Sequence, residues 1–112
     1  GVASPLNTLD VNGSVGWGAP VTKTNNFSLA VNENWVINNR AATNTVTLPA
    51  ASSYTGRVVT LSTIQAQTVV SASANVVPLI GGAAGTAILA ATAGKWATLV
   101  SDGTNWVIMA GN

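Results

Sequence analysis

Short runs in which apolar and polar residues alternate begin near Asn26 and continue to the C-terminal end of the chain. Phe27 to Val31 alternates with the period of two that is typical of a strand with one buried face. Trp35 to Ile37 and Thr45 to Leu48 follow as further strands, and Pro49 ends the last of them because it has no N–H to donate. We expect additional strands at four segments: 57–62, 67–71, 76–80 and 86–89.

The last two alternating runs flank Asp102-Gly103, a dipeptide typical of β-hairpin turns because glycine adopts positive φ without steric cost. Two registers are open. If Asp102-Gly103 forms a tight two-residue turn, Leu99 faces Trp106 and Trp96 lies opposite Met109. If the loop has three residues and begins one residue earlier, Trp96 and Trp106 come to the same face. The sequence does not decide between them.

Together these runs amount to about eight or nine short strands, and the fold class that they predict is a small all-β antiparallel sandwich or barrel. The only stretch that tolerates a helix is 83–93, and no N-cap residue precedes it. Residues 1–22 are rich in Gly and Pro and contain a single short alternating run, so we interpret them as a shaft end or linker. Residues 23–112 then form the β head domain.

The composition narrows the range of functions. Of the 112 residues, 47% are hydrophobic and only 6% are charged, against roughly 25% charged in an ordinary soluble domain. A net charge of +1, with no basic stripe, is not what a nucleic-acid-binding surface requires. The chain contains neither Cys nor His, which removes thiol nucleophiles, imidazole bases and the usual zinc ligands.

No catalytic constellation is evident. The three carboxylates, Asp10, Glu33 and Asp102, lie far apart in the sequence, in segments where turn roles explain them. The hydroxyl side chains lack a neighbouring base, and no nucleophile-elbow motif occurs. We therefore expect a protein that is not an enzyme and that has no cofactor and no metal site.

One uncharged segment approaches the length of a membrane span. Residues 76–94 contain no charge, and roughly 20 apolar residues are enough to cross a bilayer. However, Pro78, four glycines and two threonines make a poor membrane helix, and a hairpin follows at once. We interpret the segment as packed β structure and expect no membrane insertion.

The aromatic residues supply the candidate contacts. Trp96 and Trp106 occupy strand positions and are expected to anchor the core, where an indole ring can bury a large area. Trp17 lies in a Gly-rich loop, and Tyr54 lies in a Ser/Thr-rich loop. These two side chains are the candidate ligand-binding residues, either stacking on sugar rings or contacting a neighbouring subunit.

Three segments in order carry a resemblance to a known family: Asn44-Thr-Val-Thr-Leu-Pro-Ala-Ala-Ser-Ser53, Gly56-Arg-Val-Val-Thr-Leu61 and Leu99-Val-Ser-Asp-Gly-Thr-Asn-Trp-Val-Ile108. The series resembles the distal β domains of tailed-bacteriophage tail fibres and related virion appendages. Leu9-Asp-Val-Asn-Gly-Ser-Val15 is similar to the end of a fibre shaft in such proteins. Ile64 to Val70 departs from the family, which has a more polar, Asn-rich turn at this place.

The resemblance implies an extracellular, virion-attached homotrimer that either contacts the host surface or forms the structural tip of the fibre. The partner implied is a host cell-surface glycan or an outer-membrane component, and no binding residue is carried over because receptor-binding loops vary in the family. An apolar composition fits symmetric association, which buries surface that one small core cannot hide. The alternative is a monomeric carbohydrate-binding module.

Overall fold

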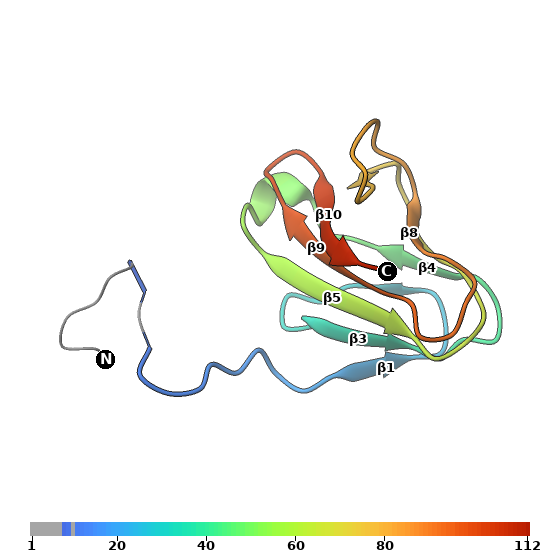
Figure 1. Cartoon of the computed structure of the whole chain (residues 1–112), viewed down its shortest axis with the longest axis horizontal. Coiled ribbons are helices and arrows are strands. Elements are labelled where there is room, and N and C mark those ends of the chain that lie inside the picture. Colours follow the sequence, from blue (N-terminus) through green and yellow to red (C-terminus); the bar gives the residue numbers. More distant parts are fainter. Residues whose placement is uncertain (1–7, 10) are drawn as a thin grey trace.

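A computed structural model describes residues 8, 9 and 11–112 of the chain. It has two mixed β-sheets that enclose one hydrophobic core between them (Figure 1), and no α-helix occurs among these residues. The six-stranded sheet has the order β1 (Val21–Lys23), β3 (Trp35–Asn38), β5 (Val58–Thr63), β9 (Trp96–Ser101), β10 (Trp106–Gly111) and β7 (Val76–Val77). The four-stranded sheet has the order β2 (Phe27–Ser28), β4 (Asn44–Thr47), β6 (Val69–Ser71) and β8 (Ala87–Leu89). The prediction of an all-β sandwich is confirmed at this level.

The expectation of antiparallel pairing is wrong for the first six strands. They alternate between the sheets, so that β1, β3 and β5 stack in parallel in one sheet and β2, β4 and β6 stack in parallel in the other. The chain thus winds around the core as a short two-sheet coil. Parallel neighbours need a crossover connection, which is usually a helix. Here a strand of the facing sheet provides each crossover. The alternation of apolar and polar residues along a strand is the same for parallel and antiparallel pairing, so the sequence does not reveal the direction.

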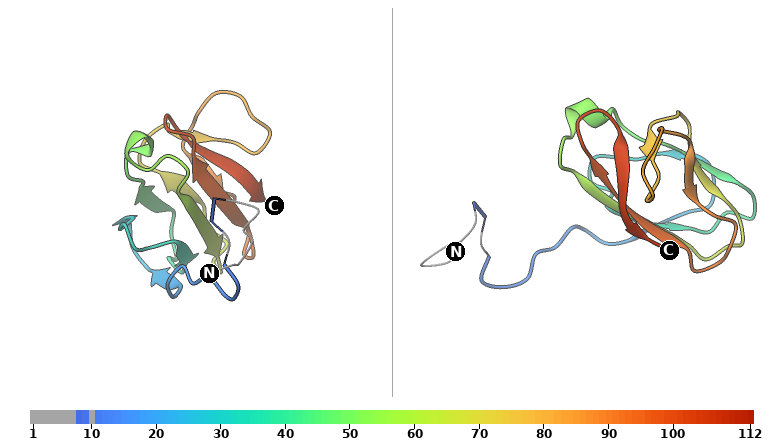
Figure 2. Two further views of the ribbon diagram at one scale, coloured as in Figure 1. Left: turned by 90° about the vertical axis from the view of Figure 1, so that its left-hand side faces the viewer. Right: turned by 45° about the horizontal axis from the view of Figure 1, so that its top comes forward.

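The C-terminal part of the chain closes this coil with antiparallel strands. β9 pairs antiparallel with β5 and with β10, and β8 pairs antiparallel with β6. β7 returns to parallel pairing on the far side of β10. The uncharged segment 76–94 therefore supplies β7, β8 and the loop between them, and that loop projects beyond the sheets (Figure 2). Within the described residues, no helix has both the length and the apolar character needed to cross a membrane.

The core consists of inward-facing residues from both sheets. In the six-stranded sheet, Val36, Leu61 and Ala97 are neighbours on adjacent strands and all face inward. Trp106 is 0% exposed, and its Nε1–H donates a 2.9 Å hydrogen bond to the carbonyl of Pro49. The prediction that Trp106 anchors the core is confirmed. It is wrong for Trp96, which is 38% exposed, because the inward positions of β9 start at Ala97 and strand residues alternate between faces.

The terminal hairpin has neither of the two expected registers. Trp106 pairs with Ser101, which leaves a four-residue loop from Asp102 to Asn105. The Asp102 carboxylate shapes this loop, because its Oδ1 accepts hydrogen bonds from the backbone N–H groups of Thr104 (2.9 Å) and Asn105 (2.7 Å). Such local bonds build longer turns than a two-residue hairpin needs. A bulge between Ile108 and Ala110 then shifts the register again.

β1 begins at Val21, inside the segment that the sequence assigns to a linker, and forms an edge of the larger sheet. The chain from residue 11 to residue 20 contains no strand and extends away from the sheets towards the N-terminus (Figure 1). Even so, this segment contributes one side chain to the site described next.

Candidate binding cleft

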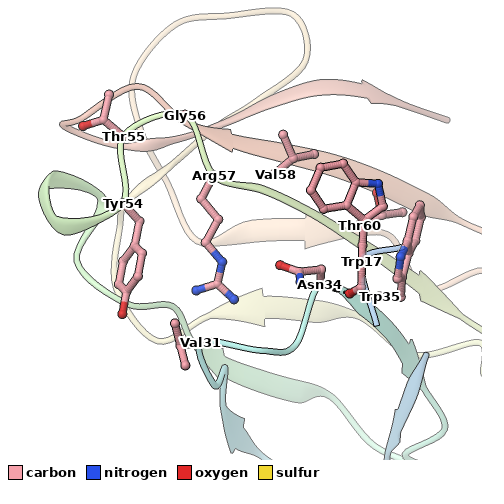
Figure 3. Close-up of a pocket in the computed structure, with 10 residues that line it drawn as sticks. All are labelled: Trp17, Val31, Asn34, Trp35, Tyr54, Thr55, Gly56, Arg57, Val58 and Thr60. Carbon is pink, nitrogen blue, oxygen red and sulfur yellow. Dashed lines mark hydrogen bonds between the residues drawn. The ribbon is translucent and has the colours of Figure 1, made fainter. Parts of the chain in front are cut away.

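A cleft of about 630 Å³ lies on the outer face of the larger sheet, at the end where β3 and β5 begin (Figure 3). Its lining includes seven residues with aromatic rings or polar side chains: Trp17, Asn34, Trp35, Tyr54, Thr55, Arg57 and Thr60. Both residues that the sequence singles out as ligand contacts, Trp17 and Tyr54, therefore line the same cleft. Four strands, β1 to β4, lie between these two residues in the sequence.

The floor of the cleft follows from the alternation along β3 and β5. Val36, Val59 and Leu61 face the core. Their neighbours Trp35 and Thr60 therefore face outward, and the two residues are paired across the sheet. Neither β3 nor β5 contains a charged residue, so the floor is an apolar and hydroxyl-bearing surface.

Two indole rings form one end of the cleft. Trp17 is 58% exposed and Trp35 is 40% exposed, and Figure 3 shows both rings beside Thr60. The segment that carries Trp17 is held in place by Asn34, whose side-chain N–H donates a 3.1 Å hydrogen bond to the Trp17 carbonyl. Large faces of both rings thus remain open to solvent while their backbone is fixed.

Tyr54 and Arg57 form the other end. The loop that carries them follows a 3-10 turn at Ala51–Ser53 and is closed by a 2.9 Å hydrogen bond from the Arg57 N–H to the Tyr54 carbonyl. A second bond of 2.8 Å, from the Gly56 N–H to the Ser101 carbonyl, ties the loop to the end of β9. The guanidinium carbon of Arg57 lies 5.1 Å from the centre of the Tyr54 ring, within the range of a cation–π contact.

The Arg57 guanidinium is held by backbone carbonyls, with no carboxylate in contact. Its Nη2 donates hydrogen bonds to the carbonyl of Ala30 (2.8 Å) and to that of Glu33 (2.9 Å). Its Nη1 is buried and has no hydrogen-bond partner. Arg57 is the single charged residue in the described lining of the cleft.

The nearest carboxylate is engaged elsewhere. Oε1 of Glu33 accepts a 2.8 Å bond from the Ala30 N–H, and Oε2 lies 2.6 Å from Lys23 Nζ. Burial raises the pKa of Glu33, but the bonds from Lys23 and Ala30 and the charge of Arg57 outweigh it, so that the pKa lies below its ordinary value. Glu33 therefore stays ionised at neutral pH and stabilises the turn before β3.

The described lining contains no carboxylate, and the described residues form no group of metal-ligating side chains. Asp102 shapes its own hairpin loop, and the hydrogen bonds from Asn105 and Thr104 lower its pKa. Asp10 lies outside the described residues. What the arrangement offers is three aromatic faces, amide and hydroxyl groups, and one cation.

Sequence reasoning missed Trp35, Asn34 and Arg57 as lining residues. For Trp35 the signal was its neighbour Val36. If Val36 faces the core, Trp35 has to lie on the opposite face of the strand. For Arg57 the sequence holds no signal, because its position depends on carbonyl groups of the distant turn at residues 30–33.

Comparison with known proteins gives no match: no family model, no curated protein and no solved structure is significantly similar to this chain. The function is therefore argued from the residues of the cleft and from the sequence resemblance.

Proposed function

We propose that this chain is the non-enzymatic head domain of a bacteriophage tail fibre or related virion appendage, and that it attaches to a glycan on the host cell surface. The location that this implies is the virion surface, outside the cell. The observation that carries the proposal is the cleft itself, in which the exposed rings of Trp17 and Trp35 lie at one end and Tyr54 and Arg57 lie at the other.

The chemistry of the cleft suits a sugar. A pyranose ring has an apolar C–H face that packs against an aromatic ring and a rim of hydroxyl groups that needs hydrogen-bond partners. Trp17 and Trp35 provide exposed ring faces, and tryptophan combines large contact area with low conformational freedom. Asn34 and Thr60 provide polar groups beside them. Pockets that combine apolar walls with a few placed polar groups are typical ligand sites.

A homotrimer is part of the proposal. The central strands β3, β5, β9 and β10 carry no charged residue. Apolar side chains also remain exposed outside the cleft: Met109 lies on β10, and Ile80 is almost fully exposed in the projecting loop. Association would cover part of this surface. Three weak sites on one axis then gain affinity through effective concentration.

The test of attachment uses two tryptophans as a matched pair. Trp17 lines the cleft, whereas Trp96 is also partly exposed but lies outside it. Fluorescently labelled protein is incubated with immobilised lipopolysaccharides and capsular polysaccharides from a panel of bacteria. Trp17→Ala should weaken binding about tenfold, equivalent to about 1.4 kcal/mol, and Trp96→Ala should leave it within about twofold. Equal losses, or no loss with Trp17→Ala, would contradict the proposal.

The second candidate is a monomeric carbohydrate-binding module. One observation favours it: Trp17, Trp35, Tyr54 and Arg57 line one cleft within a single chain. Light scattering behind a sizing column, at two protein concentrations, separates the two. A mass three times that of the 11.2 kDa chain supports the fibre head, and a single-chain mass at both concentrations supports the isolated module.

A further inference from the structure

We infer that the ligand of the cleft carries a carboxylate, as in a uronic or sialic acid, and that this group binds Arg57 while a neighbouring sugar ring stacks at Trp17 and Trp35. The inference rests on the proposed function of the cleft as a glycan-binding site. It specifies the class of glycan, which the aromatic rings alone do not.

Arg57 is a cation that forms no ion pair within the described part of the chain. The one ion pair in the described part of the chain joins Lys23 to Glu33. The two carboxylate oxygens of Glu33 bind the Ala30 N–H and the Lys23 ammonium group. The Arg57 guanidinium therefore donates only to the two backbone carbonyls. The group formed by Lys23, Glu33 and Arg57 therefore keeps a net positive charge at the edge of the cleft.

One donor group of the Arg57 guanidinium is unused. Nη1 of Arg57 is buried without a partner, and a buried polar group left unpaired loses the hydrogen bonds that water would give it. A planar guanidinium is the side chain best matched to a carboxylate, which accepts from it in a charge-assisted, fork-like arrangement. The Tyr54 ring flanks this guanidinium, with 5.1 Å between the ring centre and the guanidinium carbon, and because Nη1 is buried, a carboxylate reaches it only when the side chains that cover it move.

Backbone carbonyls already orient the Arg57 side chain. Its two carbonyl bonds, at 2.8 and 2.9 Å, fix the guanidinium between the Tyr54 ring and Asn34 (Figure 3). Ordering a long side chain on binding costs conformational entropy, and the Arg57 side chain is already ordered by its two carbonyl bonds before a ligand arrives. The two ends of the cleft therefore differ: a charged donor lies at one end and uncharged ring faces lie at the other.

The experiment compares two acidic oligosaccharides with a neutral one, and the neutral one differs from tetragalacturonate only in its reduced carboxyl groups. The unaltered protein is titrated calorimetrically with tetragalacturonate, with a sialic acid trimer, and with tetragalacturonate whose carboxyl groups have been reduced to alcohols. At low salt at least one acidic oligosaccharide should bind about tenfold more tightly than the neutral one. The preference should shrink as salt is raised, because the charges lie at a solvent-accessible cleft.

Three variants locate the preference. Arg57→Gln should abolish it, and Trp17→Ala should weaken acidic and neutral ligands by the same factor. Lys95→Gln removes the same charge at the far end of β5, where the Lys95 carbonyl accepts a bond from the Thr63 N–H, and should leave the preference unchanged. Thermal unfolding of each variant shows whether it folds. If Arg57→Gln does not fold, the comparison of the three ligands on the unaltered chain still decides.

Two results would overturn the inference. One is equal affinity for acidic and neutral oligosaccharides. The other is the absence of binding by both acidic probes. Neither result touches the attachment experiment with Trp17→Ala and Trp96→Ala, so failure of the acidic-glycan inference can be told apart from failure of the proposed function.

Discussion

Tryptophan occupies two different environments in two regions of this molecule. Trp106, the first residue of β10, is 0% exposed, and its indole N–H donates to the Pro49 carbonyl. In the cleft, Trp17 and Trp35 keep roughly half of their surfaces open, at 58% and 40% exposure. The first ring is enclosed and fully bonded, as a core residue must be. The other two lie at one end of the cleft, with Arg57 at the opposite end, and their exposed ring faces are the surface that we propose to contact a glycan.

The largest effect should come from the core side of this comparison. Trp106→Ala removes an enclosed indole and leaves the Pro49 carbonyl without its donor. We expect a loss of about 3 to 5 kcal/mol in the free energy of unfolding, which is a large share of what a domain of this size holds. Urea denaturation followed by circular dichroism measures it. A loss below about 1 kcal/mol would mean that Trp106 is not enclosed as described.

The second effect probes how tightly the same strand is packed. A Cβ at Gly111 would lie 2.7 Å from the Trp96 carbonyl oxygen and 3.3 Å from the Ala97 Cα, and neither backbone group can move freely. Gly111→Ala should cost about 1 to 3 kcal/mol. Gly85→Ala is the matched control, since its Cβ would meet nothing within 4 Å. Similar melting temperatures for both variants would contradict close packing at the end of β10.

The third effect concerns the ion pair that borders the cleft. The folded-state pKa of Glu33 is lowered, so its contribution is present above the unfolded-state pKa of about 4.3 and is lost as the pH falls through the lower folded-state value. Glu33→Gln should cost about 1 kcal/mol or less at pH 7. Between pH 7 and pH 3, the unaltered protein should lose more stability than Glu33→Gln does. Parallel curves for the two proteins would show that the carboxylate contributes nothing.

The smallest effect on stability should come from the cleft. Trp17→Ala removes a ring that is mostly exposed, and the bond from Asn34 to the Trp17 carbonyl involves only the backbone of residue 17. The free energy of unfolding should change by less than about 0.5 kcal/mol, although the proposed glycan binding should weaken about tenfold. A melting temperature that falls as far as that of Trp106→Ala would remove the distinction between the two regions.

Much of the fold could be predicted from the sequence, because alternation reports strands directly. The segments at Trp35, Val58, Trp96 and Trp106 are strands as expected. The parallel winding could not be predicted, since side-chain alternation carries no information on the direction of the neighbouring strand. The hairpin register failed for a local reason: the carboxylate of Asp102 enlarges the turn beyond the Asp-Gly pair.

The site was predictable where a residue lacked a structural explanation. Trp17 and Tyr54 stood out as large rings in polar or Gly-rich loops, and both line the cleft. Trp96 shows the opposite error, because a strand position does not say which face a ring occupies. Arg57 acquires its role only from the fold, which places it against carbonyls of a turn more than twenty residues earlier.

The most direct measurement of the division between core and cleft uses the four tryptophans of the chain as reporters. Each indole N–H gives one signal in a ¹H–¹⁵N correlation spectrum, assigned by single Trp→Phe variants, and the protein is titrated with tetragalacturonate. The account predicts that the Trp17 and Trp35 signals shift together as the cleft fills. The Trp106 signal should stay fixed and exchange slowly with solvent, and the Trp96 signal should not move. Shifts at Trp96 or Trp106 without shifts at Trp17 and Trp35 would contradict it.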